Sequence, residues 1–488
     1  MLKAIMRLKA LSSGAKLCAV TLFSGGGIGD IALELGSRKI PVIAKCELLE
    51  DRAALLRTNY PNSEIFQGDI WELKDSIAEH VHSKLNGSRP WLMVLSPPCQ
   101  GMSSNGAGRI SKAISQGKRP KEDKRNRLIL PGVDLIEELK PDWFILENVD
   151  KMQNTVIRNE DNNPENILDM MFRRLSEQYC IKSALLEFAN YGVPQFRERV
   201  VTIGCSIDAI KNLDKSPEIV YSPEKSLLHP KYTRKRLITL RQTIGDLMSH
   251  DLDGRSKLVS EGNPLHRIPE LNQEHYNLIS KTPEGETAFN NLTCNHCSHY
   301  HDPAKMTTKE RKLQTNCDNC NEFLDVPKIE VKEWICAKCS KFNGKFKRKC
   351  QYKKCGHPRN GVKSKKFWRT INGFMTSYRR MRWDEPANTI TTTSHNFTSD
   401  VKGHPEQHRV LSIEEILRCS TIIPSPKVKV PWNHKFKFEF TNKSNKLYTP
   451  KKEVDSIIRE IVGESIPPLA MYTIIKHIRS LEKKHLYD

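Results

Sequence analysis

Residues near the ends of three predicted strands are of types that could do covalent chemistry together. Cys99 follows an apolar run at 91–96 and lies in Pro97-Pro98-Cys99-Gln100, a stiff segment typical of a loop. A lone cysteine is most often a small buried hydrophobic residue, but these flanks argue against a core strand. A thiol, a carboxyl group and a guanidinium can serve as nucleophile, acid and cation. The candidates are Cys99, Glu147 and Arg197, with Asn148 and Arg199 beside them.

A second group of residues could hold a nucleoside. The segment Phe23–Gly29, FSGGGIG, follows the first apolar run, and its glycines let the backbone approach a ligand closely. Glu47 comes twenty residues after Gly27 and could accept both hydroxyls of a ribose, while Asp69 could accept an adenine amino group. Each signal alone is weak, but three in this order favour an adenosine-containing ligand. They do not separate a dinucleotide from S-adenosylmethionine.

These residues must be positioned by the elements around them. Short apolar runs alternate with helix-length segments up to about residue 205, which is typical of βαβ units in a doubly wound, largely parallel sheet. In such sheets the ligand site lies beyond the carboxyl ends of the strands. A helix is expected again at Ile466–Leu481. The expected strands are Leu17–Phe23, Val42–Cys46, Glu64–Gly68, Trp91–Ser96, Trp143–Leu146 and Val200–Cys205.

The charge of the chain points to a class of partner. Its 488 residues include 78 Lys and Arg against 57 Asp and Glu, a formal net charge of +21. That excess favours a polyanion such as nucleic acid, although many basic proteins bind none. No apolar run approaches the roughly 18 residues of a membrane span, and the first ten residues lack the apolar stretch of a secretory signal. A soluble, cytoplasmic protein is therefore expected.

Eight of the fourteen cysteines form four closely spaced pairs between residues 294 and 355. In a reducing compartment such pairs indicate metal binding rather than disulfides. Zinc takes four thiolates, which predicts two structural zinc ions. Pairing across the sets, or replacement of a cysteine by His296, His299 or His357, remains open. The first set is Cys294, Cys297, Cys317 and Cys320, and the second is Cys336, Cys339, Cys350 and Cys355.

Taken together, the motifs resemble the DNA (cytosine-5)-methyltransferases of the prokaryotic or phage modification type. FSGGGIG, Glu47, GDI at 68–70, PPCQG at 97–101, ENV at 147–149 and QFRER at 195–199 occur in the family's order. Three later segments, Arg380–Thr391, His404–Glu415 and Gly463–Pro468, are also similar to the family. One departure lies in the closing motif, where the family usually carries Asn after the glycine and this chain has Glu464.

The resemblance implies an α/β fold: a doubly wound, Rossmann-like S-adenosylmethionine-dependent methyltransferase sheet with a second, smaller, irregular zinc-containing domain. It implies that Cys99 attacks C6 of a flipped-out cytosine as a thiolate, that Glu147 binds N3, and that Arg197 anchors the base oxygen. Asn148 and Arg199 would support these residues, and a basic loop at 103–127 would close over the DNA. The implied cofactor residues are Phe23, Gly25, Gly27, Glu47, Leu48, Asp69, Ile70, Pro98, Leu128 and Ser465.

The expected domains follow from the same comparison. Residues 1–205 plus 455–488 would form the catalytic domain, and 206–454 a small target-recognition domain with a two-zinc insert at about 290–360. The second cysteine set, with Trp334 and Asn343, resembles zinc fingers of the Ran-binding-protein type. Residues 341–369 carry twelve Lys or Arg and no acidic residue, and in this position phosphate binding is favoured over an ordinary solvated face.

The expected function is methyl transfer from S-adenosylmethionine to C5 of cytosine in a specific duplex-DNA sequence, as part of a restriction-modification system. Duplex DNA would be the partner, with a cognate restriction endonuclease as the system partner. The protein would be monomeric, in the cytoplasm of a prokaryotic cell or encoded by a phage. Two alternatives are an RNA cytosine-5 methyltransferase and a non-catalytic, zinc-dependent DNA-binding protein.

Overall fold

A computed structural model describes most of the chain. Cys99 and the residues from 100 to 122, which hold most of the predicted basic loop, lie outside the described residues. The described ranges are 15–36, 39–98, 123–209, 218–220, 223–233, 236–249, 252–290, 294, 296–297, 299, 301, 316–322, 328–340, 342–344, 349–350, 355–359, 362–370, 376–432, 436–444 and 446–485.

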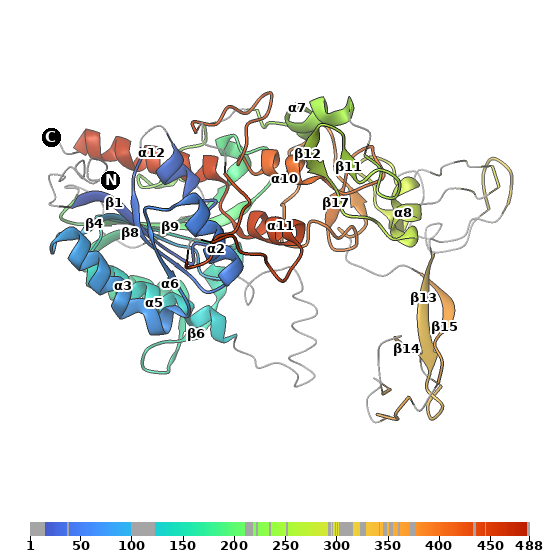
Figure 1. The fold of residues 1–488 in the computed structure, drawn as a ribbon, viewed down its shortest axis with the longest axis horizontal. Coiled ribbons are helices and arrows are strands. Elements are labelled where there is room, and N and C mark those ends of the chain that lie inside the picture. Colours follow the sequence, from blue (N-terminus) through green and yellow to red (C-terminus); the bar gives the residue numbers. More distant parts are fainter. Residues whose placement is uncertain are drawn as a thin grey trace. The chain divides into compact units, whose positions relative to one another are not determined.

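The central element of the larger unit is an eight-stranded sheet with the order β10-β8-β9-β5-β4-β1-β2-β3 (Figure 1). Neighbouring strands from β5 to β3 all pair in parallel, whereas β9 is antiparallel to both β5 and β8. The largely parallel, doubly wound sheet is therefore confirmed. The strands are β1 (Lys16–Leu22), β2 (Val42–Glu47), β3 (Glu64–Gln67), β4 (Pro90–Leu95), β5 (Trp143–Asn148), β8 (Tyr179–Glu187), β9 (Glu198–Ser206) and β10 (Glu218–Val220).

The strand order reverses beside β1, which has β2 on one side and β4 on the other. Because these strands are parallel, their carboxyl ends lie at one edge of the sheet, where a ligand site is expected. The residues that follow β1, β2, β3 and β4 are those predicted to bind the cofactor or carry the nucleophile. The topology thus places the two predicted groups along a single edge.

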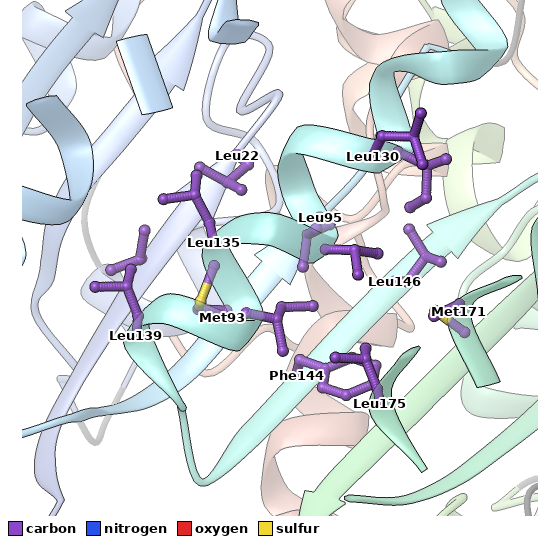
Figure 2. Packing of buried hydrophobic residues seen from close by; sticks show 14 of the residues in the cluster. Leu22, Met93, Leu95, Leu130, Leu135, Leu139, Phe144, Leu146, Met171 and Leu175 are labelled. Carbon is purple, nitrogen blue, oxygen red and sulfur yellow. The ribbon is translucent and has the colours of Figure 1, made fainter. Parts of the chain in front are cut away.

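Helices cover both faces of the sheet, with α3, α5 and α6 on one face and α12 on the other (Figure 1). Alternate residues of β5 point to opposite faces: Phe144 and Leu146 join the first apolar cluster, and Trp143 and Ile145 the second. Figure 2 shows part of the first cluster, where Phe144 lies beside Leu175 of α6. The helices of this unit are α2 (Glu50–Asn59), α3 (Ile70–Leu85), α5 (Ile129–Leu139), α6 (Ile167–Leu175), α7 (Leu240–Ile244), α10 (Ile413–Cys419), α11 (Val454–Glu464) and α12 (Pro468–His485).

The predicted terminal helix is α12, and a buried carboxylate ties it to the sheet. Glu482 accepts hydrogen bonds from the indole nitrogens of Trp91, at 2.5 Å, and Trp143, at 3.0 Å. Arg479 donates to the other carboxylate oxygen at 2.7 Å. Buried indole N–H groups need acceptors, so this carboxylate satisfies two tryptophans of the core at once.

Shorter elements complete the sheet unit. A π-helical turn follows the glycine segment in place of a full-length helix, and two short strands form a separate hairpin. These elements are the π-turn Ile31–Leu35, the 3₁₀ turns Lys124–Leu128, Asp150–Asn154, Phe188–Tyr191, Pro223–Lys225 and Gly245–Ser249, and the strands β6 (Val156–Arg158) and β7 (Pro164–Asn166).

The chain divides into two compact units whose limits differ from the expected domain boundaries. The sheet unit comprises residues 1–247, 384–392 and 413–488, and the second unit comprises 248–383 and 393–412. Residues 206–247, 384–392 and 413–454, which were expected in the small domain, belong to the sheet unit because they pack within it. The backbone N–H of Leu240 donates to the Glu385 carbonyl at 2.7 Å, and Arg418 of α10 pairs with Asp246 at 2.7 Å.

The second unit is smaller and has little regular structure. Its apolar cluster includes Leu271, Ile279, Tyr378, Phe397 and Val410. The irregular second domain predicted from the sequence is therefore confirmed as a fold feature. Its elements are α8 (Gln273–Ser280), the 3₁₀ turn Ala288–Asn290, β11 (Val259–Ser260), β12 (Asn263–Arg267), β13 (Lys328–Ile335), β14 (Phe342–Gly344), β15 (Lys365–Thr370), β16 (Arg379–Arg380) and β17 (Val401–Gly403).

Candidate active site

The glycine segment after β1 is held in place by the predicted ribose-binding carboxylate. Phe23, Gly25 and Gly27 all adopt positive φ angles, of 58°, 54° and 78°. The backbone N–H of Gly25 donates to one oxygen of Glu47 at 2.8 Å, and that of Leu49 donates to the other at 2.9 Å. Glu47 is 8% exposed. It therefore fixes both the glycine turn and the start of α2.

The three consecutive glycines face different surroundings. A Cβ atom on Gly26 would lie 2.4 Å from Ile461 of α11, and one on Gly27 would lie 2.4 Å from Tyr60. A Cβ on Gly25 would meet nothing within 4 Å. Two glycines thus allow close packing against the fold, while the third leaves open space at the strand edge. This arrangement fits a ligand that approaches the backbone.

A buried charged network supports the same turn. Lys45 of β2 is fully buried, and its Nζ lies 2.7 Å from Asp30 Oδ2 and 2.7 Å from Glu34 Oε1. The Tyr60 hydroxyl, beside this lysine, donates to the Gly27 carbonyl. Sequence reasoning missed these residues. The detectable signal was a lysine in the middle of an otherwise apolar strand, which requires buried carboxylate partners.

The residues that follow β2 and β3 include exposed apolar side chains. Asp69 is exposed and caps α3, where its Oδ1 accepts a hydrogen bond from the Trp71 N–H at 3.0 Å. Leu48 is 59% exposed and Trp71 41% exposed. Ile70, a predicted cofactor residue, is instead buried in the core of the sheet unit. Its side chain therefore serves packing.

Asn148 ties together the ends of β4 and β5. Its Nδ2 donates to the carbonyl of Pro97 at 3.0 Å, and its Oδ1 accepts from the Val149 N–H at 2.8 Å. Asn148 is 2% exposed, so both bonds are shielded from water. Pro97 and Pro98 lie directly before the predicted nucleophile, and Cys99 itself lies outside the described residues. Asn148 thus fixes the base of the segment that carries Cys99.

Glu147 is a buried carboxyl group next to an arginine. It is 6% exposed, and its Oε1 lies 3.1 Å from Nε of Arg199. Burial raises the pKa of Glu147 above its ordinary value, while the charges of Arg199 and Arg197 act in the opposite direction. A carboxyl group with a raised pKa is suited to donate a proton near neutral pH.

The contacts of Arg197 differ from the predicted role as the anchor of the base oxygen. Its Nη1 donates to the Ile390 carbonyl at 3.2 Å, and its Nη2 to the Gly463 carbonyl at 3.1 Å. The residue is 2% exposed. Two backbone carbonyls therefore accept hydrogen bonds from the terminal nitrogens of Arg197, whereas Arg199 lies beside the Glu147 carboxyl group. These contacts favour Arg199 over Arg197 as the partner of Glu147.

The closing motif packs tightly against the 384–392 segment. A Cβ on Gly463 would lie 2.3 Å from backbone atoms of Thr391 and Thr392, so only glycine fits. Ser465, a predicted cofactor residue, donates its hydroxyl to the Val462 carbonyl at 3.0 Å. Leu128, also predicted to lie near the cofactor, is partly buried and packs against the apolar core.

The cysteines group into the two sets that their spacing predicts. The four sulfurs of each set lie within 4.8 Å of one another. Sulfur separations of 3.4 and 3.5 Å in the first set, and 3.6 and 3.5 Å in the second, are far longer than a disulfide bond of ~2.05 Å. They suit a tetrahedral ion with Zn–S distances of ~2.3 Å. His296, His299 and His357 belong to neither set.

The local backbone explains how the cysteine pairs converge. Asn321, Ser340 and Gly356 each follow the last cysteine of a pair and adopt positive φ angles, of 61°, 52° and 53°. His301, which was not predicted, is buried with its Nε2 3.3 Å from Cys317 Sγ. In the second set the Trp334 ring is buried and the Arg359 guanidinium lies 5.8 Å from its centroid. The donor chemistry of both sets fits zinc.

A match to a family model shows to which family of proteins the chain belongs. The model of C-5 cytosine-specific DNA methylases matches residues 18–480. The chain belongs to this family. The family membership predicted from the motifs is thereby confirmed, and the chain is a DNA cytosine-5-methyltransferase rather than a non-catalytic DNA-binding protein.

Curated relatives are modification methyltransferases. The Type II methyltransferase M1.HgaI of Avibacterium volantium is 26% identical over 471 residues, which cover 95% of this chain and 98% of that protein. The Type II methyltransferase M1.HphI of Haemophilus parahaemolyticus is 29% identical over 190 residues, 38% of this chain and 45% of that protein.

One of the solved structures that match this chain is the Dnmt2 methyltransferase of S. pombe. The sequence identity is 10% and the TM-score is 0.48, and the match covers 97% of this chain and 100% of that one. Another is the methyltransferase EhMeth of Entamoeba histolytica, at 13% identity and a TM-score of 0.46 over 95% of this chain and 98% of that one. Among the described residues, no helix is long and apolar enough to cross a membrane.

Proposed function

We propose that this enzyme transfers the methyl group of S-adenosylmethionine to C5 of a cytosine within a specific duplex-DNA sequence, as the modification enzyme of a restriction-modification system. The full-length similarity to a Type II methyltransferase supports the system, and a cognate restriction endonuclease would then act on the same sequence. The single observation that carries the chemistry is the Glu147–Arg199 pair, one strand away from the Asn148-anchored segment before Cys99. Such an enzyme works in the cytoplasm, beside the DNA that it protects.

The cofactor site is proposed to lie at the carboxyl ends of β1, β2 and β3. Gly25 has open space where a Cβ would be, and Glu47 presents a fixed carboxylate beside it. The exposed apolar surfaces of Leu48 and Trp71 suit an adenine ring, and the exposed Asp69 carboxylate could accept its amino group. When bound, S-adenosylmethionine supplies an electrophilic methyl group. The protein's task is to hold the adenosine so that the methyl group faces the cytosine.

The target cytosine must leave the helix before it can react, because C6 is inaccessible in the stack. The Cys99 thiolate would then form a bond to C6, and the electron pair of the C5–C6 double bond would move to C5. C5 would attack the methyl carbon while the bond from that carbon to the sulfonium sulfur breaks, and S-adenosylhomocysteine would be the leaving group. Glu147 donates a proton to N3 as negative charge develops on the ring. Arg199 would orient Glu147 and, in place of the expected Arg197, bind the base oxygen. Loss of the C5 proton, departure of the thiolate and return of the N3 proton to Glu147 complete the cycle.

Zinc and DNA recognition are proposed for the second unit. Two ions would hold segments that contain few apolar residues apart from cysteine. Strand β13 pairs with β15 from Lys328 opposite Thr370 to Glu333 opposite Lys365. Strand β14 joins this three-stranded sheet only at Glu333–Ile335, so that residues 328–332 of β13 pair with β15 alone, and a two-stranded ribbon is one of the elements that the major groove admits. Its lysines and those of 341–369 would bind phosphates.

The proposal is tested by expressing the chain in cells that lack cytosine methylation and sequencing their DNA after bisulfite treatment. Protection of cytosine in one short sequence context is expected, and Cys99→Ala should abolish it. Transfer of a tritiated methyl group from S-adenosylmethionine to duplex DNA, but not to RNA, should follow the same pattern. Methylation of RNA alone, or activity that survives Cys99→Ala, would contradict the proposal.

A further inference from the structure

The departure at position 464 is accompanied by a buried partner on α2. Glu464 forms a two-point ion pair with Arg52, in which Nε donates to Oε2 at 3.0 Å and Nη2 to Oε1 at 2.9 Å. Arg52 is 6% exposed, and Glu460 lies farther away, at 3.5 Å. Two parallel hydrogen bonds fix the orientation of a guanidinium as well as its charge. The side chain of Glu464 is thus committed to Arg52.

Arg52 in turn acts on the carboxylate that holds the glycine turn. It follows Glu47 by five residues, and the two side chains interact electrostatically. Glu47 receives the backbone N–H groups of Gly25 and Leu49, so its orientation sets the shape of the proposed ribose site. Ile461, one turn before Glu464, also packs against Gly26. The end of α11 therefore contacts the glycine turn directly through Ile461 and acts on it indirectly through the Glu464–Arg52 pair.

We propose that the Arg52–Glu464 pair positions the Glu47 carboxylate for the cofactor ribose, so that residue 464 serves the cofactor site through Arg52 rather than by direct contact. The pair is a positioning device, and neither residue reacts. This inference rests on the proposed cofactor site and adds two residues that the motif comparison does not assign to it.

The sharpest test restores the residue usual in the family. Glu464→Asn leaves Arg52 buried without the carboxylate that accepts its two hydrogen bonds. The Arg52 guanidinium should then reorient or shift the position of the Glu47 carboxylate. The dissociation constant for S-adenosylmethionine should rise about 10-fold, as expected when a buried charged partner is stranded. The kcat at saturating cofactor should stay within about twofold, because the pair does not touch the reacting atoms.

A double-mutant cycle separates the pair from two independent contributions. Arg52→Met should weaken cofactor binding at least as much as Glu464→Asn. The double variant Arg52→Met with Glu464→Asn should bind no more weakly than Arg52→Met alone, because Glu464 acts only through Arg52. Arg52→Lys keeps the charge without the two-point geometry and should rescue part of the affinity.

The pH dependence provides a readout that a purely structural role would not change. Burial raises the pKa of Glu47, and the charge of Arg52 from α2 opposes this, while Glu464 from α11 adds a like charge. Loss of Arg52 should raise that pKa further, so that a larger fraction of Glu47 is protonated as pH falls. The affinity lost in Arg52→Met should accordingly be greater at pH 6 than at pH 8.

The experiment is isothermal titration calorimetry of the full chain with S-adenosylmethionine at pH 6, 7 and 8, with circular dichroism to verify folding. Glu460→Gln is the matched control, since it removes the more distant carboxylate and should change affinity by less than about twofold. If the wild type binds and Glu464→Asn binds equally well or more tightly, the inference is wrong. If the wild type does not bind, the proposed cofactor site itself fails. Should Glu464→Asn not fold, Arg52→Lys decides, because unchanged affinity and pH profile there would equally refute the inference.

Discussion

The sheet unit and the two cysteine sets are stabilised in different ways. In the sheet unit two large apolar clusters, one on each face, bury residues from every central strand. Among the described residues, the apolar cluster of the first cysteine set consists of its own cysteines, and that of the second also includes Trp334 and the partly buried Val362. Burial of apolar area stabilises the first region, whereas the proposed zinc ions would supply most of the stability of the second. The two regions should therefore respond to different perturbations.

The same contrast separates chemistry from recognition. All the polar residues that the proposed reaction requires lie on the sheet unit, where the core fixes the strand ends. The cysteine sets carry basic segments but none of the catalytic motifs. A perturbation confined to either region should leave the function of the other measurable, and four experiments test that separation.

The largest effect is expected from Cys99→Ala. Methyl transfer should be lost completely, because no other group forms the bond to C6. Zinc content and cofactor affinity should be unchanged. DNA containing 5-fluorocytosine should trap the wild type covalently and fail to trap the variant. Cys205→Ala is the control, since burial raises the pKa of that thiol well above its ordinary value and trapping should persist. Trapping by Cys99→Ala would place the nucleophile elsewhere.

Glu147→Gln should lower kcat by about 10²- to 10⁴-fold, because the amide can still bind N3 but cannot transfer a proton. Since burial raises the pKa of Glu147, the protonated fraction falls as pH rises through that pKa, and the wild-type rate should decline there. The variant should lack this decline. Single-turnover rates between pH 5.5 and 9 provide the measurement, and a variant with the wild-type profile would remove Glu147 from the proton transfer.

Replacement of Cys336 and Cys339 by serine should release one equivalent of zinc and lower DNA affinity. The slope of log DNA affinity against log salt concentration should become shallower, because phosphate contacts are lost. Cofactor binding by the sheet unit should persist. Elemental analysis and fluorescence titration provide the measurements. Replacement of Cys297 and Cys320 is the control and should release only the other equivalent. Loss of both ions from either variant would show that the ligands pair across the sets.

The smallest effect concerns acid stability of the sheet unit. His229 is buried between Ser226 and the Val201 carbonyl, each at 2.8 Å, and burial lowers its pKa from 6.5 to about 4. Between these pH values His229 therefore binds a proton in the unfolded chain but stays neutral in the folded chain. Stability should fall by up to about 1.4 kcal/mol per pH unit in this window as pH decreases. Urea unfolding of metal-free protein should show this slope, and His229→Gln should flatten it.

Much of the sheet could be predicted because its strands are apolar runs that end in functional motifs. Each of the six expected strands is present within two residues at either end. Strand β8 was missed because Lys182 and Ser183 interrupt its apolar pattern, and both find partners only in the folded sheet. The domain boundaries differ because residues 206–247, 384–392 and 413–454 belong to the sheet unit. The contacts that hold these segments there leave no periodic signal in the sequence.

The candidate site could be listed from the sequence, but its internal geometry could not. Glu147, Asn148 and Glu47 lie at the strand ends where the motifs place them. Which of Arg197 and Arg199 faces the carboxyl group depends on how distant carbonyls, at 390 and 463, approach β9. The buried network around Lys45 likewise joins residues whose proximity follows from folding alone.

Gly463 and Glu464 are adjacent in the closing motif but constrained in opposite ways. At 463 the backbone of residues 391 and 392 leaves no room for any side chain. At 464 the side chain is one-third exposed, and it is held by its ion pair with Arg52, which lies 412 positions earlier in the sequence. The first position should therefore be invariant among descendants of this enzyme, whereas the second can drift whenever Arg52 changes with it. Paired substitution at 52 and 464 is the evolutionary signature that this ion pair should leave.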